Sequence, residues 1–158
     1  MQVCAFTGHR KIEDGHKGRI DDLLLRAISY AYENGCRTFA TGGALGFDTL
    51  AAREIIRFRM SHPDVRFVVV LPCKNQSDSW SASQVNMYEY TLLNADEIEY
   101  VSDEYTDGCM KERNGRLADM CDMLIAYVGR SDSGAAQTVR MATRLGKKVY
   151  NLYPTLEK

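Results

Sequence analysis

Short, nearly uninterrupted apolar runs alternate along this chain with longer segments whose apolar residues recur every three or four positions. Apolar runs of this kind are typical of strands that are buried on both faces of a sheet. We therefore predict six β-strands, at Val3–Thr7, Thr38–Thr41, Val65–Leu71, Glu97–Val101, Met123–Val128 and Lys148–Leu152.

The segments between these strands predict five helices. The clearest apolar stripe runs from Ile20 to Ala31, and Asn34–Gly35 follows it as a helix stop. Asp48 stands near the start of the second stripe, where we expect it to cap the helix. The remaining stripes are Leu50–Met60, Val85–Leu93, Cys109–Cys121 and Gly134–Leu145.

Strands that alternate with helices of this length predict an α/β fold. Right-handed crossovers would build a Rossmann-like, doubly wound and mainly parallel sheet of about six strands, with helices on both faces. No repeat, low-complexity stretch or Pro/Gly-rich linker interrupts the 158 residues. We therefore expect residues 1–158 to form a single domain.

Composition narrows the range of partners. The formal net charge is −1, so no overall basic field attracts nucleic acid or an anionic membrane, and we expect neither as a partner. We interpret the one local basic cluster as a solvated helix face. It consists of Arg53, Arg57, Arg59, Lys147 and Lys148.

Cysteine usage and the apolar runs predict a cytoplasmic location. The five cysteines are odd in number and include no Cys-x-x-Cys pair, which argues against a disulfide framework or a zinc site. The longest apolar run, Phe67–Leu71, is too short to span a bilayer, and the first residues do not resemble a signal peptide.

Two glycine-bearing turns, Thr7–Arg10 and Thr41–Asp48, each follow an apolar strand. The carboxyl ends of parallel strands meet at one edge of a sheet, which is where open α/β sheets bind ligands. Glycine lets backbone N–H groups approach a ligand closely, and a following helix N-terminus favours an anion. Ser133–Gly134, at the last helix start, would add a third such turn. The pattern predicts a phosphate-bearing small molecule, most plausibly a nucleotide.

Each of these features also has a purely structural interpretation. Gly42–Gly46 is neither a dinucleotide fingerprint nor a Walker loop, so it could be a tight turn without a ligand. Ser133 could be an ordinary N-cap. Trp80 could stack on a base or anchor a helix, and His9 could be an acid/base group or make a structural hydrogen bond.

Two charged features have similar alternatives. Arg10 is suited to binding an anion through two hydrogen bonds, whereas Arg113 could simply form a surface salt bridge. The acidic cluster Asp103, Glu104 and Asp107 lacks the spacing of metal ligands, and we interpret it as a solvated loop.

As a set, these segments resemble the YpsA-like family of the SLOG superfamily, which is named for the SMF/DprA and LOG proteins. The resemblance includes a Pro-x-x-x-Gln-x-x-x-Trp element, an Arg-Asn…Asp-x-Leu-Ile-Ala segment and a second glycine turn. The residues that carry it are Thr7–Arg10, Gly42–Asp48, Ala51–Ala52, Pro72–Trp80, Arg113–Asn114, Asp122–Ala126 and Ser133–Gly134.

The resemblance implies a Rossmann-like fold and a nucleotide-type ligand held between the two glycine turns. Superfamily members include LOG phosphoribohydrolases, DprA-type proteins that bind single-stranded DNA, and sensors of nucleotide-derived signals. LOG enzymes carry a catalytic glutamate in Pro-Gly-Gly-x-Gly-Thr-x-x-Glu, whereas Ser133–Arg140 contains no acidic residue. The charge and the absence of DprA's extra domains argue against DNA binding.

We therefore predict a bacterial protein that binds a nucleotide or an ADP-ribose-like derivative as a sensor or regulatory module, with no resident metal or cofactor. The alternatives are a LOG-like N-glycoside hydrolase, with His9 and Asp48 as its acid/base pair, and a protein-interaction or single-stranded DNA-binding module. A protein partner and self-association stay open. The expected ligand contacts are Thr7, Gly8, His9, Arg10, Gly42, Gly43, Ala44, Gly46, Asp48, Gln76, Trp80, Arg113, Asn114, Ser133 and Gly134.

Overall fold

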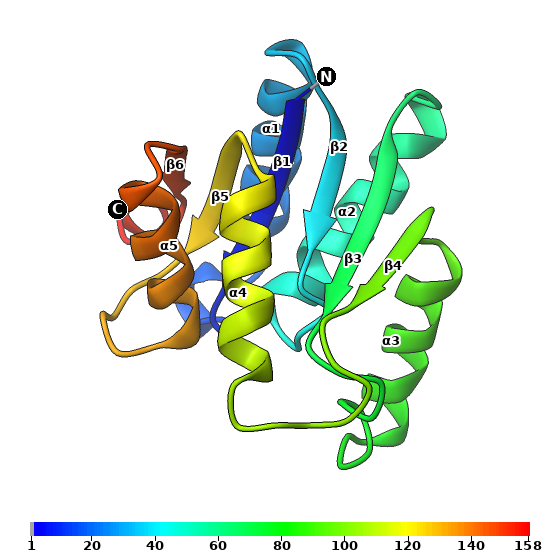
Figure 1. Ribbon diagram of the computed structural model, residues 1–158. Coiled ribbons are helices and arrows are strands. Elements are labelled where there is room, and N and C mark those ends of the chain that lie inside the picture. Colours follow the sequence, from blue (N-terminus) through cyan, green and yellow to red (C-terminus); the bar gives the residue numbers. More distant parts are fainter. Residues whose placement is uncertain (1) are drawn as a thin grey trace.

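The computed structural model describes residues 2–158 and contains one six-stranded sheet in which every neighbouring pair is parallel (Figure 1). The strand order is β4-β3-β2-β1-β5-β6. This confirms the predicted Rossmann-like α/β architecture. The strands are β1 (Gln2–Gly8), β2 (Cys36–Thr41), β3 (Arg66–Leu71), β4 (Glu97–Tyr100), β5 (Met123–Tyr127) and β6 (Lys148–Asn151).

Helices cover both faces of the sheet, as predicted, with α4 and α5 together on one face (Figure 1). The five predicted helices are present, together with a short 3-10 helix (Asp14–His16) and a C-terminal turn of helix that the apolar pattern did not indicate. The α-helices are α1 (Arg19–Glu33), α2 (Phe47–Ser61), α3 (Ala82–Leu93), α4 (Cys109–Met120), α5 (Gly134–Arg144) and α6 (Tyr153–Leu156).

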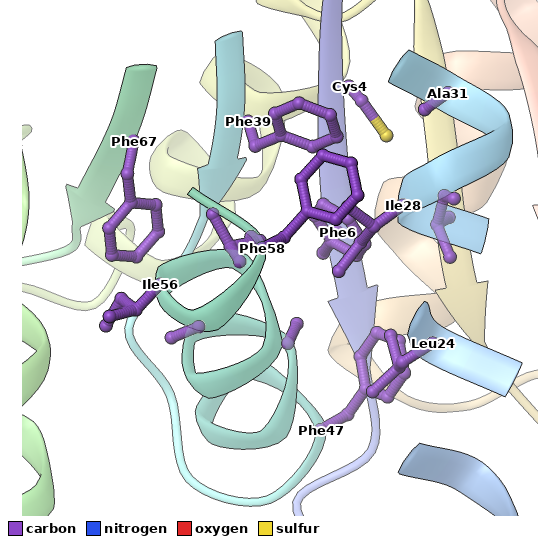
Figure 2. Close-up of a cluster of buried hydrophobic side chains, with 14 of the residues drawn as sticks. Cys4, Phe6, Leu24, Ile28, Ala31, Phe39, Phe47, Ile56, Phe58 and Phe67 are labelled. Atoms are coloured by element: carbon purple, nitrogen blue, oxygen red, sulfur yellow. The ribbon is translucent and has the colours of Figure 1, made fainter. Parts of the chain in front are cut away.

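The larger core lies between the sheet and helices α1 and α2 (Figure 2). Phe6 of β1 and Phe39 of β2 stack with ring centroids 6.4 Å apart, and Leu24 and Ile28 of α1 pack against the same cluster. Cys4 is fully buried there, and all five cysteines are free and buried. Across residues 2–158, no helix combines the length and apolar character needed to cross a bilayer.

The strand order determines where a ligand can bind. β2 pairs with one edge of β1, and β5, which comes later in the chain, pairs with the other edge. The connections that follow β1 and β5 therefore run in opposite directions from the carboxyl ends of these two strands. Gly8, the last residue of β1, pairs with Tyr127, the last residue of β5. Crevices at such reversal points are the usual ligand sites of open α/β sheets.

Candidate functional site

A cavity of about 470 Å³ lies at this reversal point. It brings together much of the predicted contact set, from the end of β1, the start of α2, helix α4 and the start of α5. The predicted residues among its lining are Thr7, Gly8, His9, Arg10, Ala44, Asp48, Arg113, Asn114, Ser133 and Gly134.

Gln76 and Trp80 do not line this cavity. The Gln76 side chain donates to the carbonyl oxygen of Gly43 at 3.1 Å, so it supports the turn. The Trp80 ring packs edge-to-face on Tyr88 of α3, with centroids 5.1 Å apart, which is the anchoring role rather than base stacking. Trp80 lines a separate, much smaller void of about 10 Å³, and Gln76 bonds to the turn beside that void. The structure therefore does not bring either residue to the cavity.

Packing requires the glycines that carry the two turns. A Cβ on Gly8 would lie 2.4 Å from the ring of Phe47, and a Cβ on Gly43 would lie 2.3 Å from Leu71. Gly46 has φ +79° and sits against the Arg10 carbonyl, where a Cβ would come within 2.0 Å of the oxygen. The Phe47 N–H also donates to the His9 carbonyl at 3.1 Å. The two turns therefore hold each other in place.

Arg113 supplies a buried positive charge to the cavity. It is only 5% exposed, so the surface salt bridge considered from sequence is wrong. One guanidinium nitrogen donates to the Gly42 carbonyl and Nε donates to Asn114 Oδ1 at 2.9 Å. Asn114 in turn donates to the Gly134 carbonyl at 3.3 Å. This chain of contacts joins the turn after β2 to the start of α5.

Asp48 is the buried acidic group of the cavity, 5% exposed. Its Oδ2 accepts from the Ala44 N–H at 3.2 Å, while its buried Oδ1 has no hydrogen-bond partner. Burial raises the pKa of this carboxyl from 3.8 to about 6, against the opposing charge of Arg113. The predicted helix cap is wrong: Gly46 occupies the N-cap of α2, and Asp48 bonds back to the turn.

His9 acts as a hydrogen-bond acceptor for the backbone. Its Nε2 accepts from the Gly129 N–H at 2.8 Å, so the neutral ring must carry its proton on Nδ1. Burial lowers the pKa of His9, and Arg130 lowers it further, which favours this neutral form. Among the described residues, the hydrogen bonds of His9 and Asp48 go to the backbone of Gly129 and Ala44, and no hydrogen bond joins the two side chains.

The start of α5 forms the opposite wall. Ser133 is its N-cap, and Oγ accepts from the Ala136 N–H at 3.1 Å, as the ordinary capping alternative predicted. The N–H groups of the first turn have no partner within the helix and carry its positive dipole end. Gly134 and Ala135 belong to this turn and line the cavity. This wall suits an anion.

Several lining residues were not selected from sequence. Lys11 and Arg130 add two exposed positive charges at the rim, and Asp132 lies near Arg130, with 3.1 Å between its Oδ1 and the arginine Nε. Their positions could have indicated them, since Lys11 follows Arg10 and Arg130 lies three residues after the end of β5. Met110 and Leu117 of α4 add apolar surface, which helical spacing alone attributes to the core.

Two other sequence interpretations can be compared with the structure. The basic cluster divides between α2 and the region at β6, and all three of its arginines form ion pairs, Arg53 with Asp21, Arg57 with Glu54 and Arg59 with Asp96. Among the residues that the structure describes, no three His, Cys, Asp or Glu side chains gather as a metal site would require.

Comparison with known families agrees with this architecture. A family model described as the YspA SLOG family matches residues 4–153. The chain belongs to this SLOG family. Its curated relatives include the uncharacterised SPbeta prophage-derived protein YoqJ of Bacillus subtilis, which is 28% identical over 91% of this chain and 88% of its own length. A UPF0398 protein of Bacillus thuringiensis is 24% identical over 97% and 88%.

Solved structures show that other proteins share the SLOG fold. DNA processing protein A from Helicobacter pylori, described for its single-stranded DNA binding mode, superposes with TM-score 0.66 at 18% identity over 94% of this chain. DprA from Streptococcus pneumoniae gives 0.67 at 18% over 96%. TM1055 gives 0.59 at 16% over 94%, and 72% of that chain is covered. The present chain spans 63% and 50% of the two DprA chains.

Proposed function

We propose that this SLOG protein binds a phosphate-bearing small molecule of the nucleotide type in the cavity between β1 and β5. The observation that carries the proposal is the convergence of positive groups on one crevice. Arg10, Lys11, Arg113 and Arg130 surround it together with the amino end of α5. A helix N-terminus and arginine guanidinium groups are the usual partners of phosphate.

The size and lining of the cavity also suit a nucleotide. A volume of about 470 Å³ falls within the range of small-molecule sites. Its polar groups lie beside an apolar strip from Met110 and Leu117, which offers a surface for a base or sugar. Since Ser133–Arg140 has no acidic residue where LOG enzymes carry their catalytic glutamate, we propose binding, in a sensor or regulatory role in the bacterial cytoplasm, rather than N-glycoside hydrolysis.

Titration calorimetry against nucleoside mono-, di- and triphosphates, ADP-ribose and NAD tests the proposal. Arg10→Ala should weaken binding about ten-fold, because a hydrogen bond to a charged group contributes about 1.5–3 kcal/mol. Arg26→Ala is the matched control, since Arg26 is exposed on α1 and away from the cavity lining. Absence of binding across the panel with folded protein would overturn the proposal.

A second candidate is single-stranded DNA binding, favoured by the likeness to DNA processing protein A. The exposed cations Arg10, Lys11 and Arg130 would contact the phosphates, against a net charge of −1. Mobility shifts at low and physiological salt discriminate, because binding driven by phosphate contacts falls steeply with salt. No shift at low salt removes this candidate.

A further inference from the structure

Two buried polar atoms of residues that line the cavity have no hydrogen-bond partner within the protein. They are Oδ1 of Asp48 and Nδ1 of His9. The two residues are 5% and 8% exposed, so bulk water does not compensate for the missing bonds. Buried polar groups are nearly always paired, so an unpaired one needs an explanation such as a bound molecule, a water, an ion or a catalytic role.

The two atoms require opposite partners. Nδ1 of His9 carries the ring proton, because Nε2 already accepts from Gly129, so Nδ1 needs an acceptor. The ionised Asp48 carboxylate can only accept, so Oδ1 needs a donor. Arg113 does not serve Asp48 as that donor, since its resolved bonds go to the Gly42 carbonyl and to Asn114.

A phosphate group satisfies the first requirement but not the second. At neutral pH a phosphate group is anionic, and its oxygens act mainly as hydrogen-bond acceptors. Next to the Asp48 carboxylate it would also be repelled, because both groups are negatively charged. A Cβ on Gly42 would lie 2.8 Å from Arg113 Nη1 and 3.0 Å from Asp48 Oδ2, so cation and carboxylate face the same glycine. The polarity of the cavity thus changes over a short distance.

We infer that Asp48 determines specificity by accepting a hydrogen bond from a sugar hydroxyl of the ligand, so that the site selects ribonucleotides over phosphate esters lacking free hydroxyls. The inference rests on the proposed function. The phosphate lies toward the α5 wall and the ribose toward Asp48. A site built to bond a hydroxyl rejects the analogue without it, because its own polar group stays unpaired.

Calorimetry with matched probes at pH 8 tests this inference. The probes are the four common ribonucleoside 5′-monophosphates, their 2′,3′-dideoxy counterparts and inorganic phosphate. Wild-type protein should bind the dideoxy compound at least about ten-fold more weakly than its ribonucleotide. Asp48→Ala should abolish that difference while leaving the affinity for inorganic phosphate equal or higher, because a negative charge has been removed. If Asp48 had a purely structural role, Asp48→Ala would weaken the binding of ribonucleotides and of inorganic phosphate alike.

Controls keep the outcomes distinct. Asp22→Asn removes an exposed carboxylate of α1. It should change neither the ratio of ribonucleotide to dideoxynucleotide affinity nor the affinity for inorganic phosphate. If Asp48→Ala does not fold, Asp48→Asn keeps the shape and should reduce the ribo-to-dideoxy ratio. Equal binding of ribo and dideoxy probes by wild type would overturn the inference and leave the proposed function standing. Asp48 Oδ1 would then face the neighbouring void of about 10 Å³, which Asp48 also lines, rather than the ligand. No binding of any of these probes would overturn the inference, and absence of binding across the wider nucleotide panel above would overturn the proposed function as well.

Discussion

The buried carboxyl of Asp48 should contribute less to the stability of the folded protein above pH 6 than below pH 4. Its pKa in the folded state is about 6, against an ordinary 3.8, because burial disfavours the charged form. Since the folded pKa is the higher one, the folded chain holds this proton more tightly than the unfolded chain. The resulting stabilisation is present below about pH 4 and is lost as the pH rises through 6.

The magnitude follows from the shift. About two pKa units at 1.36 kcal/mol each correspond to about 3 kcal/mol in the free energy of unfolding. Asp48→Asn replaces the ionised group with a neutral one of the same shape, whose carbonyl oxygen can still accept from the Ala44 N–H. Relative to wild type, the variant should therefore gain about 3 kcal/mol between pH 4 and pH 8.

Urea unfolding of the ligand-free protein, followed by circular dichroism at one-unit steps from pH 4 to pH 8, measures this gain. In thermal scans at pH 8 the same change corresponds to about 6 to 12 °C in Tm for a domain of this size. Asp22→Asn, exposed on α1, is the control and should show a flat difference. A difference between Asp48→Asn and wild type that is independent of pH, or that favours wild type as the pH rises, would refute the reasoning.

Two further predictions concern the turns. Gly46→Ala should destabilise the fold by at least about 2 kcal/mol, because the position has φ +79° and a Cβ would meet the Arg10 carbonyl, whereas Gly15→Ala, exposed and with open space around it, should stay within about 0.5 kcal/mol in the same urea assay. Ser133→Ala should cost about 1 kcal/mol through loss of the α5 cap, and Ser131→Ala, an exposed residue outside the helix, provides the comparison; equal effects of the two would contradict the capping role.

The central strands were predicted well because strands that are buried on both faces have uninterrupted apolar sequences. Val68–Leu71 is buried throughout, and β5 likewise. The edge strand β4 was also predicted from its apolar residues, but three of its four residues are exposed, because a strand at the edge of the sheet has less cover. The turn of helix at Tyr153–Leu156 is too short to show a period, so it was missed.

The candidate site was predicted less completely. Topology alone brings Gly8 and Ser133–Gly134 to one edge, so those predictions needed only the strand order. The burial of Arg113 depends on how α4 packs across the sheet, which no local pattern encodes. Gln76 and Trp80 follow β3, two strands away from the reversal point, and the strand order rather than their residue types keeps them from the cavity.

The two walls of the cavity are built with different freedom to change. On one side, Gly8 lines the cavity and packs against the buried ring of Phe47, which ties this wall to the core. On the other, the segment from Gly129 to Asp132 is exposed, although Gly129 bonds to His9 and packs against Tyr153, and the Ser131 carbonyl accepts from Arg140. A substitution at Gly8 should therefore destabilise the fold, whereas the exposed side chains of Arg130 and Asp132 can be replaced at little cost in stability to change what the cavity recognises.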